Sequence, residues 1–166
     1  METLNAISPI DGRYRRSTEK LSDYFSEASL IKYRVKVEVE YFIALCELPL
    51  EQLKDIPQSS FEKMRDIYRN FSLEDAKEVK EIGKTTNHDV KAVEYFLKKH
   101  FEALGLGEHK EYIHFGLTSQ DINNTSVPLS LRDCHNETLL PMLNEVLEIL
   151  SQKAQEWNNV PMLAHT

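Results

Sequence analysis

Apolar residues recur every three or four positions along most of this 166-residue chain, and this period constrains the fold more than any other feature. One series runs through residues 21–46, and Pro49 closes it. Another runs through residues 90–104 and stops at Gly105, a typical left-handed residue after a helix. Only five glycines and six prolines are present, which leaves little room for a turn-rich β architecture. The sequence therefore predicts an all-α fold.

Capping residues predict where some of these helices begin and end. Ser72 and Asp75 have the spacing of a capping box and predict a polar helix that ends near Gly83. Thr86 is the predicted N-cap of the next helix, with Asp89 as the acidic residue of its first turn.

The last part of the chain predicts a long amphipathic helix with an apolar stripe over residues 139–157. Thr118 and Asp121 give a further capping-box spacing before it. Pro128 and Pro141 break or kink this stretch unless each lies in a first helical turn. An amphipathic helix must bury its stripe. We expect the partners of this one in the first helices, in another chain, or in sequence beyond residue 166.

Composition excludes several classes of protein. The net charge of -7 argues against a nucleic-acid surface, which needs a basic face. The longest apolar run, "YFIALCELPL", is too short to span a membrane, and no basic-then-apolar leader opens the chain. Two widely separated cysteines, Cys46 and Cys134, are interpreted as reduced thiols of a cytoplasmic protein.

Three polar clusters lie where a loop is expected to become a helix: Arg13 with Tyr14, residues 85–89, and residues 118–121. A helix N-terminus presents free N–H groups and the positive end of the helix dipole, so it favours anions. Two such termini close together suit a substrate with several carboxylates or a phosphate. The plain alternatives are a solvated arginine beside a packed tyrosine, and ordinary N-caps.

Other kinds of site find no support in the spacing. Neither the His-Glu-x-x-His pattern nor paired cysteines of a zinc site occur, and His109 and His114 are five residues apart, off a common helical face. No glycine-rich phosphate loop is present. Ser119 follows His114 closely, but nothing in the pattern indicates a serine–histidine–carboxylate arrangement.

Four stretches, "SPIDGRYR", "TTNHDVKAVEYFL", "IHFGLTSQDINN" and the closing "VPMLAHT", occur in an order and at spacings that resemble the N-terminal part of the adenylosuccinate lyases. This family belongs to the fumarase/aspartase superfamily. The resemblance covers essentially the whole chain. The stretch "TTNHDVKAVE" is the most specific piece, whereas "TSQD" is shared across the superfamily.

The resemblance implies a small helical domain over residues 1–110 and the beginning of a long-helix bundle over residues 111–166. It also implies a homotetramer whose subunits pool their bundles. From the charge and the apolar runs described above, neither a nucleic acid nor a membrane is expected as a partner. The implied reaction is a β-elimination without a cofactor, and no metal is expected. It releases fumarate from adenylosuccinate, giving AMP, and from the succinyl-carboxamide ribotide of purine synthesis.

The same resemblance assigns roles to the histidines. His165 lies where the family has its general acid, a role suited to a side chain that holds and gives a proton near neutral pH. His88 corresponds to a second active-site histidine that orients the substrate, beside Asn87 and Asp89.

Two further pairs are implied to bind substrate. Thr118 and Ser119 correspond to residues that contact the succinyl carboxylates. Arg13 and Tyr14 correspond to an arm that contacts the nucleotide at its phosphate.

The sequence departs from the family where the general base is expected. The family's base is a serine in the pattern Ser-Ser-x-Met-Pro-x-Lys-x-Asn-Pro, and this pattern does not occur here. We therefore expect an N-terminal fragment without activity of its own. Also, the residue before His165 is Ala164, where many members have threonine.

Two other functions stay open at this point. The first is another lyase of the superfamily, or a cycloisomerase of the carboxymuconate type, which would share "TSQD" but not the residues around His88. The second is a non-catalytic helical module that only assembles with partners, to which the apolar stripes would contribute.

Overall fold

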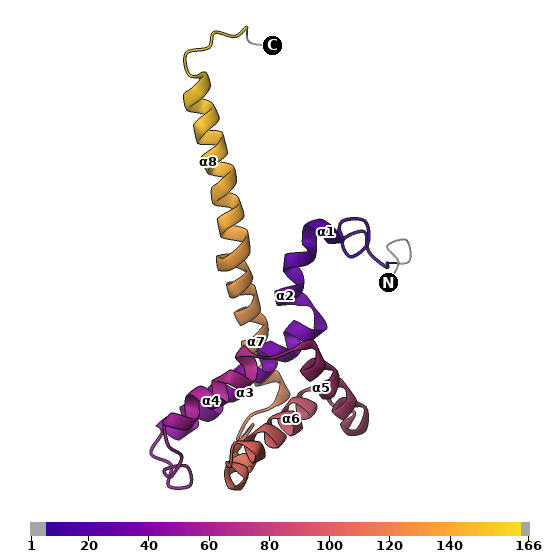
Figure 1. Ribbon diagram of the computed structural model, residues 1–166, viewed down its shortest axis with the longest axis vertical. Helices are drawn as coiled ribbons and strands as arrows, with labels where there is room; N and C mark the ends of the chain where they lie inside the picture. Colours follow the sequence, from indigo (N-terminus) through magenta and orange to yellow (C-terminus); the bar gives the residue numbers. More distant parts are fainter. Residues whose placement is uncertain (1–5, 164–166) are drawn as a thin grey trace. The chain divides into compact units, whose positions relative to one another are not determined.

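The structure is a computed structural model that describes residues 6–163. It divides into two units, residues 1–131 and residues 132–166, each of which is described by itself. All regular elements of the described residues are helical, which confirms the predicted all-α class (Figure 1). Residues His165 and Ala164 lie outside the described part. The predicted domain boundary near residue 110 stays a prediction.

The first unit contains short helices in its N-terminal part and four longer ones that form its body. The elements are α1 (Arg15–Thr18), η2 (Glu19–Leu21), α2 (Ser22–Phe25), α3 (Glu27–Glu47), α4 (Ser59–Arg69), α5 (Leu73–Thr86), α6 (Asp89–Ala103) and the 3₁₀ helix η3 (Gly107–Tyr112). The helix α7 (Ser119–Cys134) begins in this unit and crosses its boundary.

The core of the first unit lies where α3 packs against α4, α5 and α6. Phe42 of α3 and Phe101 of α6 are fully buried and meet edge to face, with ring centroids 4.8 Å apart. Phe96 also packs in this core, and its ring meets Phe71 edge to face. Burial of such side chains contributes about 1.5–3 kcal/mol each relative to exposure. The core thus fixes α3 and α6, which carry most of the site.

The predicted first helix is interrupted, because Ser26 has an extended backbone and separates α2 from α3. Its hydroxyl accepts a hydrogen bond from the Ser29 N–H, so it is the N-cap of α3. The apolar residues keep their three-to-four-residue spacing across this break, so the sequence pattern does not show that the helix is interrupted. The end of α3 at Glu47, just before Pro49, agrees with the prediction.

The capping box of α5 is confirmed, since Ser72 and Asp75 bond to one another's backbone N–H groups. The predicted end near Gly83 is wrong, because α5 continues to Thr86. Thr86 therefore cannot cap the next helix. His88 takes that place, and its ring accepts a hydrogen bond from the Lys91 N–H.

Pro128 and Pro141 lie in different parts of their helices. Pro141 lies in the first turn of α8 (Leu140–Trp157), where its missing N–H is tolerated. Pro128 lies inside α7, which continues past it. Gly105, with φ +78°, follows α6 in the left-handed conformation, as predicted.

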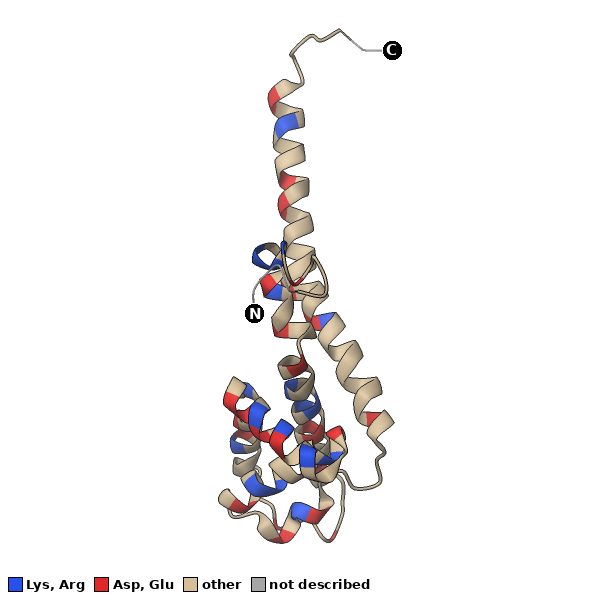
Figure 2. Cartoon of the chain, turned by 90° about the vertical axis from the view of Figure 1, so that its right-hand side faces the viewer, with Lys and Arg blue, Asp and Glu red and all other residues tan. Residues whose placement is uncertain are grey.

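The second unit contains the last residues of α7, a π-helical turn (His135–Leu139) and α8. Every residue of α8 is exposed, including Leu143, Val146, Leu147 and Leu150 of the predicted stripe. Charged residues are sparse along this helix (Figure 2). The helix therefore presents an unburied apolar face.

Candidate functional site

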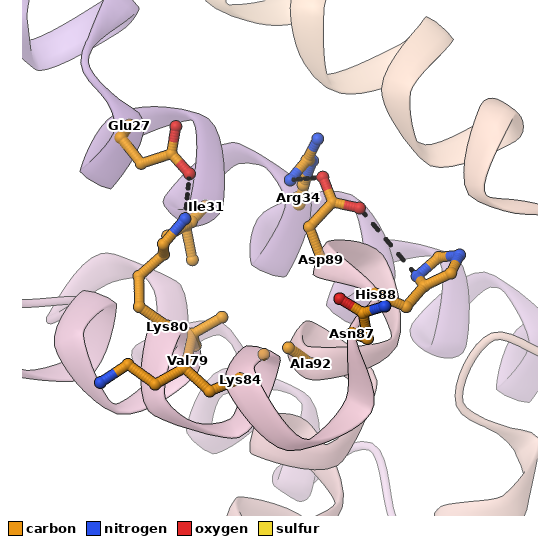
Figure 3. Close-up of a pocket in the computed structure, with 11 residues that line it drawn as sticks. Glu27, Ile31, Arg34, Val79, Lys80, Lys84, Asn87, His88, Asp89 and Ala92 are labelled. Atoms are coloured by element: carbon orange, nitrogen blue, oxygen red, sulfur yellow. Dashed lines mark hydrogen bonds and ion pairs between the residues drawn. The ribbon is translucent and has the colours of Figure 1, made fainter.

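The second polar cluster forms the junction between α5 and α6. Asn87 has the left-handed conformation, with φ +50°, and ends α5 by donating its N–H to the Gly83 carbonyl. Asparagine tolerates this conformation better than most residues. His88 then caps α6 through its ring nitrogen Nδ1, 3.1 Å from the Lys91 backbone nitrogen. The chain reverses direction here and turns the imidazole outward (Figure 3).

His88 meets the third polar cluster through its other ring nitrogen. Its Nε2 lies 3.1 Å from the Ser119 hydroxyl, at the first residue of α7. Because Nδ1 accepts the Lys91 N–H, a neutral His88 carries its proton on Nε2 and donates it to Ser119. The hydroxyl proton of Ser119 is then free to point to another acceptor. Two clusters 31 residues apart in sequence are thus joined at two helix N-termini.

This contact does not make a nucleophilic triad, although Asp89 is close by. In such a triad Nδ1–H donates to a carboxylate and Nε2 accepts the serine proton. Here Nδ1 is already an acceptor and lies 4.0 Å from the nearer Asp89 oxygen (Figure 3). His88 therefore orients Ser119 rather than activating it as a nucleophile.

Asp89 points to Arg34 of α3 instead. The Arg34 Nη1 lies 2.8 Å from an Asp89 oxygen, and its Nε donates to Asn123 of α7 over 3.0 Å. Burial alone would raise the pKa of Asp89, but the Arg34 charge and the Val90 N–H lower it below its ordinary value. Arg34, with its side chain 7% exposed, thus links α3, α6 and α7 behind the site.

The first turn of α7 is shaped by Thr118 and Asp121. The Thr118 N–H and hydroxyl both donate to one Asp121 oxygen, at 2.7 and 2.8 Å. These bonds lower the pKa of Asp121 below its ordinary value. The predicted spacing therefore does produce a side-chain cap. The Thr118 hydroxyl is engaged locally, whereas Ser119 faces His88.

A cavity of about 500 Å³ opens beside His88, between α3 and the α5–α6 junction (Figure 3). Asn87, His88 and Asp89 line one side of it. Lys80 and Lys84 of α5 line the other side, and their ammonium groups bind Glu27 and Glu81. Ile31, Val79 and Ala92 also line the cavity, so its lining is mixed, and its two lysines already have carboxylate partners.

The other predicted site residues are not brought into this cluster by any contact among the described residues. The Arg13 guanidinium lies 5.3 Å from the centre of the Tyr14 ring, and both residues are exposed at the start of α1. His165 lies outside residues 6–163, so its position is not described. The structure thus joins the second and third clusters, while the first stays apart from them.

Sequence reasoning missed two charged residues on α3, Arg34 and Glu38. Both are buried, and both contact the segment around α7. The signal was present, since a charged residue within the apolar stripe of a long helix needs a partner in the interior. The identity of that partner depends on tertiary packing and could not be deduced from the period.

The protein family described as "Lyase" matches this chain over residues 12–166. The chain belongs to the lyase family. His88 and Ser119 both lie within the matched residues.

Relatives that are named for an enzymatic activity resemble all 166 residues of this chain. The adenylosuccinate lyases of Dictyostelium discoideum, Vibrio cholerae and Escherichia coli are 52%, 41% and 39% identical to it. The chain spans only 37% of the length of each of these relatives.

Within residues 6–163, no helix is both long and apolar enough to cross a membrane. The same part of the chain brings together no group of three or more His, Cys, Asp or Glu side chains that could hold a metal ion.

Proposed function

We propose that this chain belongs to an adenylosuccinate lyase, which cleaves adenylosuccinate to AMP and fumarate and acts on the succinyl-carboxamide ribotide in the same way. The observation that carries the proposal is the His88–Ser119 contact between two helix N-termini, in a chain that resembles enzymes of this name along its full length. A succinyl group has two carboxylates, and two helix N-termini favour such an anion.

The arrangement supports distinct roles for the joined residues. His88 donates to Ser119, so the serine hydroxyl is free to donate to a succinyl carboxylate. The backbone N–H groups of the first turn of α7 add to this binding. In the elimination, charge develops on the carboxylate next to the carbon that loses its proton. Ser119 binds at that end, and Asn87, His88 and Asp89 orient the substrate. Thr118, whose hydroxyl donates to Asp121, shapes the turn that presents Ser119.

The remaining steps need residues beyond this cluster. A base removes the proton from the succinyl carbon, the carbon–nitrogen bond breaks, and an acid protonates the leaving nitrogen. We assign the acid to His165. Arg13 and Tyr14 bind the nucleotide, for which their exposed cation and aromatic ring are suited. We expect the base in sequence of the full-length protein outside this chain.

Substitution of His165 tests the assignment in the full-length protein. We expect His165→Ala to lose at least a hundredfold in fumarate release, the range that general acids contribute, while substrate binding is kept. The loss is followed by the ultraviolet absorbance of adenylosuccinate, and binding by calorimetry. His109→Ala, a histidine of η3 outside the cluster, is the control. Normal turnover by His165→Ala would show that another group is the acid.

The exposed face of α8 supports a homotetramer in which helices of several subunits cover one another. An isolated amphipathic helix is marginal in water and gains most of its stability from packing. The enzyme is proposed to work in the cytoplasm. Sedimentation of the full-length protein tests the assembly, and a stable monomer would contradict it.

A further inference from the structure

Three residues on one face of α3 contact the segment 114–123, which comprises the turn before α7 and the first residues of α7. Arg34, Glu38 and Tyr41 are four and three residues apart, which places them on one helical face. Arg34 donates to Asn123, Glu38 contacts His114 and the Tyr41 hydroxyl donates to the Phe115 carbonyl at 2.8 Å. These contacts tie the segment to α3 at both ends.

Glu38 is the unusual member of this set. Its side chain is 0% exposed, and Oε1 lies 2.5 Å from the Nδ1 of His114. The other oxygen, Oε2, is buried and has no hydrogen-bond partner among the described residues. Burial raises the pKa of Glu38 above its ordinary value, although His114 opposes this effect. Burial of a carboxylate with one unpaired oxygen costs free energy, and the contact with His114 offsets only part of this cost.

The partner of Glu38 has an unusual backbone. His114 has φ +62°, a left-handed conformation that costs energy for a residue with a side chain, and Gly116 follows with φ +73°. Such conformations persist only when the surrounding structure imposes them. The Leu117 N–H donates to the His114 carbonyl and closes the turn over residues 114–117. Thr118 follows, and Ser119 comes next and meets His88. The direction of this turn therefore sets where the Ser119 hydroxyl lies.

We propose that Glu38 is a positioning residue that acts through His114 and thereby holds the 114–117 turn so that Ser119 meets His88. Glu38 touches no part of the His88–Ser119 pair itself and works through the turn. This inference rests on the proposed function at one point, the binding of the substrate by Ser119.

The test uses four variants of the full-length protein. Glu38→Leu removes the acceptor for His114 but keeps a buried side chain of similar size. Glu38→Gln keeps an acceptor without the charge. Glu38→Asp keeps the charge but is one methylene shorter, and serves if Glu38→Leu fails to fold. Glu40→Gln is the matched control, because Glu40 lies on the same helix and pairs with Arg65 of α4 instead.

We expect Glu38→Leu and Glu38→Asp to raise KM and to lower kcat/KM by about tenfold to a hundredfold, the range for a displaced binding group. Their kcat changes less. Glu38→Gln stays within about threefold of the parent, since its oxygen still accepts from His114. Glu40→Gln leaves KM unchanged. The proposal is overturned if Glu38→Leu has the same KM as the parent. If Glu38→Leu does not fold, the same result in Glu38→Asp overturns it. So does an equal loss in Glu38→Gln.

Crystal structures of the parent and of a folded Glu38 variant separate this inference from the proposed function. We expect the distance between Ser119 Oγ and His88 Nε2 to grow well beyond its 3.1 Å in the variant. An unchanged distance refutes the positioning role. If the parent cleaves no adenylosuccinate, the proposed function fails, while this distance still decides the role of Glu38.

Discussion

Arg34→Met tests whether the link behind the site stabilises it. Arg34 joins α3 to Asp89 at the start of α6 and to Asn123 in α7. Methionine has a similar length and keeps the aliphatic packing of the arginine stem. The substitution therefore removes the two polar contacts and the charge, and little else.

The expected cost follows from the exposure of each partner. The Asp89 side chain is 61% exposed, so its ion pair with Arg34 contributes no more than about 1 kcal/mol. The bond from the buried guanidinium to Asn123 contributes about 1.5–3 kcal/mol, as for other hydrogen bonds of charged groups. Loss of the desolvation cost of the buried charge offsets part of this sum. A net local destabilisation of about 2 kcal/mol is expected.

Hydrogen exchange followed by mass spectrometry measures this local cost. About 2 kcal/mol corresponds to roughly thirtyfold faster exchange, which we expect in the first turns of α6 and α7. Arg69→Met is the control, because Arg69 pairs with Glu62 within α4, away from the site. Exchange in α6 and α7 that differs less than twofold between Arg34→Met and the parent would refute this account of the link.

Two further substitutions test the backbone and the buried carboxylate. Gly116→Ala should lower the free energy of urea unfolding by about 1–2 kcal/mol, because φ is +73° there. Gly83→Ala, inside α5, should raise it by about 0.5–1 kcal/mol, since the new Cβ would lie at an ordinary contact distance of 3.8 Å from Ala92. Equal effects of the two substitutions would contradict this reasoning. Because the pKa of Glu38 is raised in the folded protein, stability falls as the pH rises above the ordinary value of 4.5 and through the folded value. Glu38→Gln should remove this fall in the urea midpoints. A fall of the same size in both proteins would show that another group causes it.

Local signals predicted much of the fold. Ser72 and Asp75 form their capping box, and Gly105 takes the left-handed conformation after α6, because both depend on neighbours in the chain. The predicted cap at Thr86 is wrong because α5 continues through that residue. Extension of α5 to Thr86 leaves His88 as the first extended residue before α6. An imidazole is an uncommon cap, so propensity favoured the threonine.

The site shows the same division between local and long-range information. The sequence placed His88 and Ser119 at helix starts, and both lie at such positions. Their mutual contact, and the ties from Arg34 and Glu38, depend on how α3, α6 and α7 pack. Periodicity shows which face of a helix is buried but not what it meets. Charged residues within an apolar stripe indicate that each has a polar partner in the interior.

His88 is expected to have two separable functions, because each ring nitrogen has its own partner. Asparagine is among the best N-cap residues, so His88→Asn should keep the bond to the Lys91 N–H and change stability by less than about 0.5 kcal/mol. Its shorter side chain cannot also reach Ser119, so the full-length variant should bind substrate more weakly. His88→Ala loses both contacts and should also cost about 1 kcal/mol in thermal unfolding. If His88→Asn bound substrate as tightly as the parent, the donation from Nε2 to Ser119 would have no part in binding, and His88 would be a helix cap alone.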